Sequence, residues 1–171
     1  MSKIEDNCRA LWKEVFGDSD SFIEHFMSRY YCRENFLYIE EEGELQSMLH
    51  LVPFRNNGNT IGIIYALATT AVSHSKGYAT LLLQRAKERA LSLGYTAIAL
   101  IPAQASLFIY YNKRGFMGKY RVEFILPDDF DFGIDDKENQ WLAIMPLKKG
   151  YTPILTSDTI ALTWDIHNYS K

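Results

Sequence analysis

The chain has 171 residues, of which 47% are hydrophobic and 23% charged, and this composition excludes global disorder. Its net charge of −3 argues against a nucleic-acid binder, because such proteins usually carry a basic surface. No apolar run reaches the ~18 residues that span a bilayer, and residues 1–6 lack the apolar core of a signal peptide. We therefore expect a cytoplasmic protein that binds neither nucleic acid nor membrane.

The first elements along the chain are two helices rich in aromatic residues. Apolar residues recur at helical spacing over residues 4–16, where Gly17 ends the pattern. Asp18 or Ser19 then offers an N-cap for a second helix, which carries aromatic residues four apart. We expect both helices to pack against a core through these faces.

Strand patterns follow from residue 36 onward. Residues 36–40 and 46–54 read as strands around the turn at residues 42–44, and Asn57-Gly58 is a strong hairpin signal. The next run, residues 60–72, is apolar on both faces, as in a strand buried on both sides.

A strand–helix–strand unit comes next, with a helix over residues 78–93 and an apolar strand over residues 95–101. Such a unit predicts a right-handed parallel crossover. A short helix over 105–113, weaker strands over 120–126, 141–147 and 159–166, an acidic loop at 127–136 and a linker at 148–157 complete the pattern. The fold class is therefore mixed α/β (α+β), within one domain over residues 1–171.

The turn before the third predicted helix is the most informative segment. Residues 75–80 lie at a helix N-terminus, where the first amides have no partner in the helix and the dipole is positive. Such a turn binds phosphate or pyrophosphate. A glycine that serves only the chain reversal explains the turn equally well on local grounds. The two cysteines, Cys8 and Cys32, are too far apart for a metal or redox motif, and we expect no metal.

Two segments together resemble the GCN5-related N-acetyltransferase (GNAT) family. Residues 67–80, Leu-Ala-Thr-Thr-Ala-Val-Ser-His-Ser-Lys-Gly-Tyr-Ala-Thr, are similar to the acetyl-CoA motif Arg/Gln-x-x-Gly-x-Gly/Ala. Residues 101–116 resemble the second signature, a short helix that carries a tyrosine and closes with Gly-Phe. The match covers a core of about residues 60–116. The amino-acid sequence of the second segment is similar to that of the enhanced-intracellular-survival acetyltransferases, one branch of the family. His74 departs from the motif, because the family usually has Arg or Gln there.

The resemblance implies a mostly antiparallel sheet with a central splayed strand, flanking helices and acetyl-CoA as cosubstrate. Backbone groups of Leu67 and Thr69 would pair with the pantetheine arm. Gln104 would contact the same arm. The pyrophosphate would lie on the turn before the helix, formed by Ser75, Lys76, Gly77, Tyr78, Ala79 and Thr80.

The resemblance also implies catalytic roles. Tyr111 matches the tyrosine that protonates the departing thiolate, a step for which a phenol within hydrogen-bond reach is suited. The run over residues 60–72 lacks the carboxylate that serves many relatives as a base. By residue type His50 is the candidate base, against the alternatives of a core histidine and of deprotonation through water.

The expected function is transfer of an acetyl group from acetyl-CoA to a primary amine by direct attack in a ternary complex. The alternative is a CoA-binding sensor or interaction module without catalysis, which the absent strand carboxylate and His74 favour. The acceptor, a small-molecule or peptide amine, would bind between the aromatic N-terminal helices and the C-terminal strands. A homodimer stays open, as does the role of an extension over residues 148–171.

Overall fold

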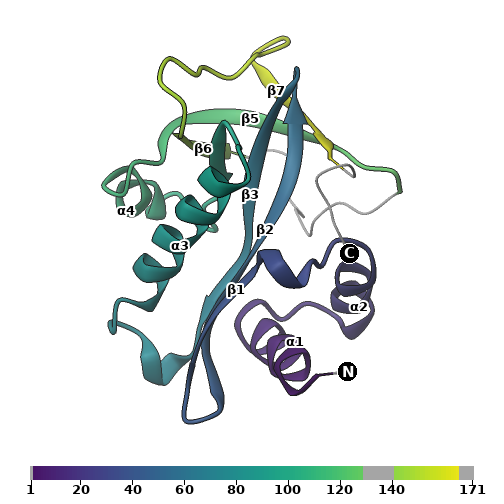
Figure 1. Ribbon diagram of the computed structural model, residues 1–171, viewed down its shortest axis with the longest axis vertical. Helices are drawn as coiled ribbons and strands as arrows, with labels where there is room; N and C mark the ends of the chain where they lie inside the picture. Colours follow the sequence, from purple (N-terminus) through teal and green to yellow (C-terminus); the bar gives the residue numbers. More distant parts are fainter. Residues whose placement is uncertain (1, 129–140, 166–171) are drawn as a thin grey trace. The chain divides into compact units, whose positions relative to one another are not determined.

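A computed structural model describes residues 2–128 and 141–165 of the chain (Figure 1). Most of the acidic segment 127–136 and the end of the predicted strand 159–166 lie outside the described residues. The elements are α1 (Lys3–Phe16), α2 (Asp20–Arg29), η1 (Arg33–Asn35), β1 (Phe36–Glu41), β2 (Glu44–Asn56), β3 (Asn59–Thr69), η2 (Ala71–Ser73), α3 (Tyr78–Ser92), β4 (Ala97–Leu100), α4 (Leu107–Asn112), β5 (Met117–Ile125), β6 (Trp141–Pro146) and β7 (Thr159–Trp164).

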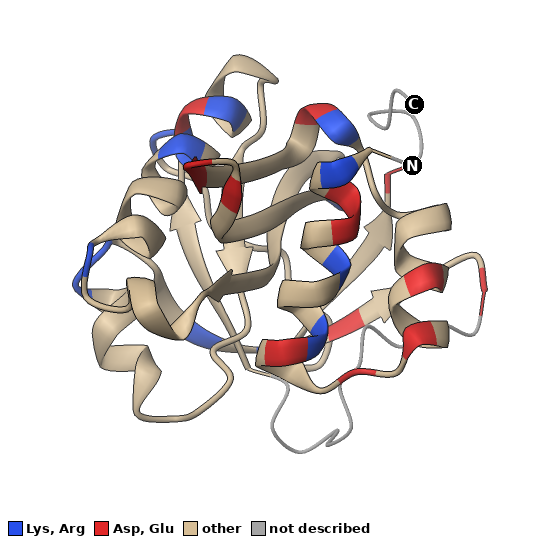
Figure 2. Cartoon of the chain, turned by 90° about the horizontal axis from the view of Figure 1, so that it is seen from below, with Lys and Arg blue, Asp and Glu red and all other residues tan. Residues whose placement is uncertain are grey.

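The described residues form two compact units. The first consists of those within Met1–Val52 and Ile64–Arg89, and the second of those within Pro53–Ile63 and Ala90–Ser170. Strands β2 and β3 run through both units. Figure 2 shows acidic residues interspersed with basic residues on the helices.

The first unit begins with the two predicted helices, which are confirmed. Gly17 closes α1 with a φ of 72°, and the Ser19 hydroxyl caps α2 by accepting a hydrogen bond from the Phe22 amide at 3.2 Å. The Trp12 and Phe26 rings meet edge to face with centroids 4.8 Å apart, and both side chains are buried. The aromatic faces of the helices therefore form the core of this unit, as expected.

The hairpin of β1 and β2 and the helix α3 complete the first unit. Phe36 pairs with His50 and Glu41 with Glu44, so the turn falls where the sequence predicted it. Arg85 on α3 donates a hydrogen bond to the Tyr38 carbonyl at 3.2 Å, which ties the helix to β1. The apolar face of α3 is buried, with Leu82, Leu83 and Ala86 at most 3% exposed.

The predicted end of the central strand was wrong by three residues. Strand β3 ends at Thr69, and Ala71–Ser73 form a single 3₁₀ turn. The Ser73 amide bonds to the Thr70 carbonyl, which closes this turn, and the Ser73 hydroxyl bonds to Gln46. Small and β-branched residues fit both a strand and a 3₁₀ turn, so the hydrogen bonds of Ser73 determine where β3 ends.

The second unit contains strand segments whose pairing closes on itself. β3 pairs parallel with β4, β4 antiparallel with β6, β6 antiparallel with β5, and β5 parallel with β7. β7 then pairs antiparallel with the end of β2, which is itself a neighbour of β3 (Figure 1). Closure leaves no edge strand in this ring. The parallel crossover through α3 is confirmed, and β7 is placed in the sheet.

Buried polar contacts hold the C-terminal strand in the ring. The Asn56 side chain donates hydrogen bonds to the carbonyls of Ile154 and Ala161, at 3.1 and 3.2 Å. The carboxylate of Asp165 accepts hydrogen bonds from Arg55 at 2.9 Å and from Thr60 at 3.2 Å.

All seven strands belong to one sheet in the order β1-β2-β3-β4-β6-β5-β7. Two of its pairings, β3–β4 and β5–β7, are parallel. The predicted mixed fold with a mostly antiparallel sheet and flanking helices is confirmed.

Candidate functional site

The turn between β3 and α3 has the geometry of an anion cradle. Ser75 and Gly77 have positive φ values of 70° and 81°, so the backbone reverses twice before the helix begins at Tyr78. A Cβ atom built on Gly77 would meet nothing within 4 Å. The space above this glycine is open, and α3 begins at the next residue, Tyr78. A helix N-terminus carries the positive end of the helix dipole. These features fit a phosphate group.

Side chains of β2 hold this turn in place. The Gln46 side-chain carbonyl accepts hydrogen bonds from the hydroxyls of Ser73 at 2.6 Å and Thr70 at 3.3 Å. The Gln46 backbone carbonyl also accepts a hydrogen bond from the Thr70 amide at 2.9 Å. Sequence reasoning missed Gln46, because nothing in a strand pattern shows which residue will face a distant turn.

Two side chains of the turn are engaged by an acidic residue on β1. Glu41 lies 3.3 Å from the Lys76 ammonium and accepts a hydrogen bond from the Tyr78 hydroxyl. The Tyr78 hydrogen bond, followed by the Lys76 contact, lowers the pKa of Glu41, and the same carboxylate raises the pKa of Tyr78. The positive charge of Lys76 is therefore balanced by Glu41. His74, at the motif's unusual position, is exposed and its ring contacts the Thr69 carbonyl at 3.1 Å.

The central strand is irregular in the segment proposed to bind the pantetheine arm. Its parallel ladder with β4 joins Ile61–Ile63 to Ala97–Ala99. Ala66 then has a φ of 50°, a value that an alanine seldom adopts inside a strand. Leu67 and Thr69 are half-buried on either side of buried Ala68. No local sequence pattern marks Ala66, because alanine has no preference for a positive φ.

Tyr111 and Gln104 lie in the second unit. Tyr111 is on α4, where its ring meets Phe116 edge to face with centroids 6.1 Å apart. Burial raises the pKa of Tyr111 to about 12, so the phenol keeps its proton throughout the physiological range. Gln104 is exposed in the loop before α4. The other candidates, Ser75 to Thr80, belong to the first unit.

The structure places His50 in the aromatic core of the first unit. It is 2% exposed, and its ring lies within 5.4 Å, centroid to centroid, of Trp12, Phe26 and Phe36. The Cys8 sulfur is 3.7 Å from its Nε2 atom. Burial lowers the pKa of His50 to about 3, so the ring is neutral at physiological pH. The location is that of a core histidine, one of the alternatives raised by the sequence.

Metal-binding groups and membrane-spanning helices are both absent from the part of the chain that the structure describes. Within residues 2–128 and 141–165, no three His, Cys, Asp or Glu side chains are grouped so that they could hold a metal ion. No helix in the same ranges has the length and apolar character required to cross a bilayer.

Comparison with protein families gives one match over most of the chain. A family model described as "Acetyltransferase (GNAT) domain" matches residues 2–117. A search of curated proteins finds no match.

Solved structures with the same fold are similar over different shares of their length. The GNAT family N-acetyltransferase YhbS from Escherichia coli, in complex with CoA, is 15% identical with a TM-score of 0.61, covering 98% of this chain and 87% of that chain. A GCN5-related N-acetyltransferase from Anabaena variabilis is 18% identical with a TM-score of 0.55, covering 71% of this chain. This chain spans only 31% of the Anabaena chain.

The narrower resemblance to the enhanced-intracellular-survival branch finds little support. Eis1 from Mycobacterium abscessus is 12% identical with a TM-score of 0.51, covering 71% of this chain and 30% of that chain. At such identities the likeness concerns the fold alone.

Proposed function

The chain belongs to the GNAT acetyltransferase family, and from this premise we propose that it transfers an acetyl group from acetyl-CoA to a primary amine. The transfer would be a direct attack in a ternary complex, within a single acetyltransferase domain. The observation that carries the proposal is the turn from Ser75 to Thr80, with its two positive-φ residues and open space at a helix N-terminus.

Each residue of the turn has a separate task in this proposal. The amides of Tyr78, Ala79 and Thr80 would donate hydrogen bonds to the pyrophosphate, together with those of the Ser75–Gly77 turn. Lys76 would leave Glu41 and face the phosphates instead. Backbone groups of Leu67 and Thr69 would pair with the pantetheine arm, and Gln104 would contact the arm from the second unit.

Acetyl-CoA supplies an activated thioester, and the residues of this chain would handle the protons. Tyr111 would donate a proton to the departing sulfur, because its phenol stays protonated up to a pKa of about 12. His50 is the proposed base by residue type, with water as the alternative. The pKa of about 3 and the burial of His50 favour water, since a ring so weakly basic holds a proton poorly.

The first test of the proposal is a thermal melt with and without saturating acetyl-CoA. A ligand at 100 times its Kd stabilises the folded state by about 2.7 kcal/mol, which corresponds to about 5–10 °C for a domain of this size. A panel of primary amines with a thiol-release readout then tests transfer. No melting shift at millimolar acetyl-CoA would refute the cosubstrate site.

Two observations favour a second function. β3 carries no carboxylate, and the candidate base His50 is buried in an aromatic core. A CoA-binding sensor or interaction module without catalysis fits both facts. This alternative predicts a melting shift with CoA and no thiol release with any amine in the panel.

A further inference from the structure

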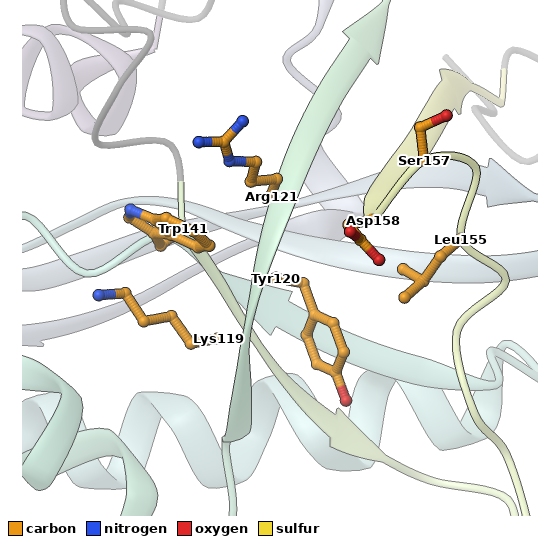
Figure 3. Close-up of a pocket in the computed structure, with 7 residues that line it drawn as sticks. All are labelled: Lys119, Tyr120, Arg121, Trp141, Leu155, Ser157 and Asp158. Atoms are coloured by element: carbon orange, nitrogen blue, oxygen red, sulfur yellow. The ribbon is translucent and has the colours of Figure 1, made fainter.

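Two cations bracket one tryptophan on the surface of the second unit. Lys119 and Arg121 are on β5, and both project to the same side of that strand as the Trp141 indole of β6 (Figure 3). The Lys119 ammonium is 4.8 Å from a ring centroid of Trp141, and the Arg121 guanidinium carbon is 5.5 Å away. Both cations are exposed, whereas the tryptophan is half-buried. We call these three residues the cation–indole surface.

A β-bulge produces this arrangement. Met117 pairs with Ile144 and Tyr120 with Leu142, so two residues of β5, Gly118 and Lys119, lie opposite one residue of β6. Gly118 has a φ of 77°, and a Cβ atom there would lie 2.4 Å from the Tyr120 ring. Only glycine therefore fits this position. Bulges of this kind re-aim side chains and are frequent beside functional sites.

The cation–indole surface borders a hollow of about 400 Å³. Its lining residues are Lys119, Tyr120, Arg121, Trp141, Leu155, Ser157 and Asp158. In Figure 3 the one acidic residue of this set, Asp158, lies on the opposite side of β5 from the two cations. Among the described residues, neither Lys119 nor Arg121 forms an ion pair with a carboxylate. Two adjacent cations that pair with no carboxylate in the described part of the chain favour an anion between or beside them.

The surface is continuous with the helix that carries the proposed acid. The Lys119 ammonium also lies 5.6 Å from the ring centroid of Phe108, which is on α4. Tyr111 is three residues further along the same helix and contacts Phe116, directly before β5. An anion held here would therefore lie close to the helix of the acid.

We propose that the cation–indole surface binds the carboxylate of the acceptor, so that the substrate class is an amine bearing a carboxylate, such as an amino acid. This inference rests on the proposed function. The guanidinium and the ammonium would contact the carboxylate oxygens, and the Trp141 ring would fix the direction of both cations by cation–π contact.

The activity test compares amines that differ by the carboxylate alone. 4-Aminobutyrate and butylamine form one pair, and amino acids with their decarboxylated amines form the rest. We expect kcat/KM to be about tenfold or more higher for the carboxylate-bearing member of each accepted pair. The variant K119Q/R121Q should lose this preference. The control K148Q/K149Q removes two exposed cations of the same unit and should keep the preference.

A second readout does not depend on activity. The contribution of Trp141 to the fluorescence is the difference between the unmodified chain and W141F. We expect the ratio of iodide to caesium quenching of that contribution to be higher in the unmodified chain than in K119Q/R121Q, because two cations attract the anion. The control K148Q/K149Q should keep the ratio of the unmodified chain.

The possible outcomes separate the two proposals. An unchanged ratio of iodide to caesium quenching in K119Q/R121Q, or a carboxylate preference that survives in that variant, would overturn the anion site. A weaker affinity for CoA in K119Q/R121Q would also overturn it, because the cations would then serve the cosubstrate's phosphates. Absence of thiol release with every amine would overturn the proposed function, whereas the quenching comparison would still decide the anion site.

Discussion

Burial of His50 should make the fold sensitive to mild acid. Its pKa falls from 6.5 to about 3 on folding because the ring is removed from water. The unfolded chain therefore binds a proton below pH 6.5 that the folded chain does not. The stabilising contribution is complete above pH 6.5 and is lost as the pH falls toward 3.

The size of the effect follows from the shift. Each pH unit within this window changes the free energy of unfolding by up to about 1.4 kcal/mol. Between pH 6.5 and about pH 5 the loss sums to about 2 kcal/mol, or roughly 4–8 °C in Tm. Asp and Glu side chains titrate mainly below this range, so the histidine contribution can be separated from theirs.

The assay is urea unfolding at several pH values for the unmodified chain and for His50→Phe. Phenylalanine retains an aromatic ring among Trp12, Phe26 and Phe36 but cannot titrate. We expect the variant to lose about 2 kcal/mol less than the unmodified chain over this pH range. A constant difference in unfolding free energy between the unmodified chain and His50→Phe would refute the reasoning.

Three further predictions concern the candidate site. Gly77→Asp should weaken CoA binding by about tenfold or more, because it places a carboxylate in the open space above the turn. Tyr111→Phe should leave CoA affinity unchanged and lower kcat about 10²-fold where chemistry limits the rate. Because the pKa of Tyr111 is about 12, its deprotonation should cause no loss of activity at any pH well below that value. Glu41→Gln should strengthen CoA binding by less than about tenfold, most clearly at low salt, because Lys76 loses its competing carboxylate.

Matched controls give each of these predictions a clear test. Gly94 also has a positive φ, 74°, with open space around it. Gly94→Asp should therefore lose as much stability as Gly77→Asp, but it should retain its affinity for CoA. Tyr110→Phe should keep the full rate; an unchanged rate in Tyr111→Phe would remove that residue from the acid role. Glu42→Gln should leave CoA affinity unaltered, and weaker binding in Glu41→Gln would mean that Glu41 positions the turn rather than competing with the ligand.

Much of the fold could be predicted from the sequence because its signals are local. Helical spacing, the Gly17 stop and the Asn57-Gly58 turn each depend on neighbours within a few residues. The site turn belongs to this group, since a helix N-terminus with Gly77 can be recognised from the chain alone. The paired signatures at residues 67–80 and 101–116 pointed to the family, and the match over residues 2–117 confirms it.

Tertiary structure decided the features that depend on partners far apart in the chain. Gln46 reaches the site turn across 27 residues, and Asn56 bonds to Ala161 across 105, so neither role is visible in a local pattern. The same holds for Glu41 beside Lys76, and for β7 closing the ring onto β2. His50 shows the reason most clearly: its residue type suggested a base, but the rings packed around it set its pKa. Residue identity determines which chemistry is available, and burial and distant contacts determine whether it is used.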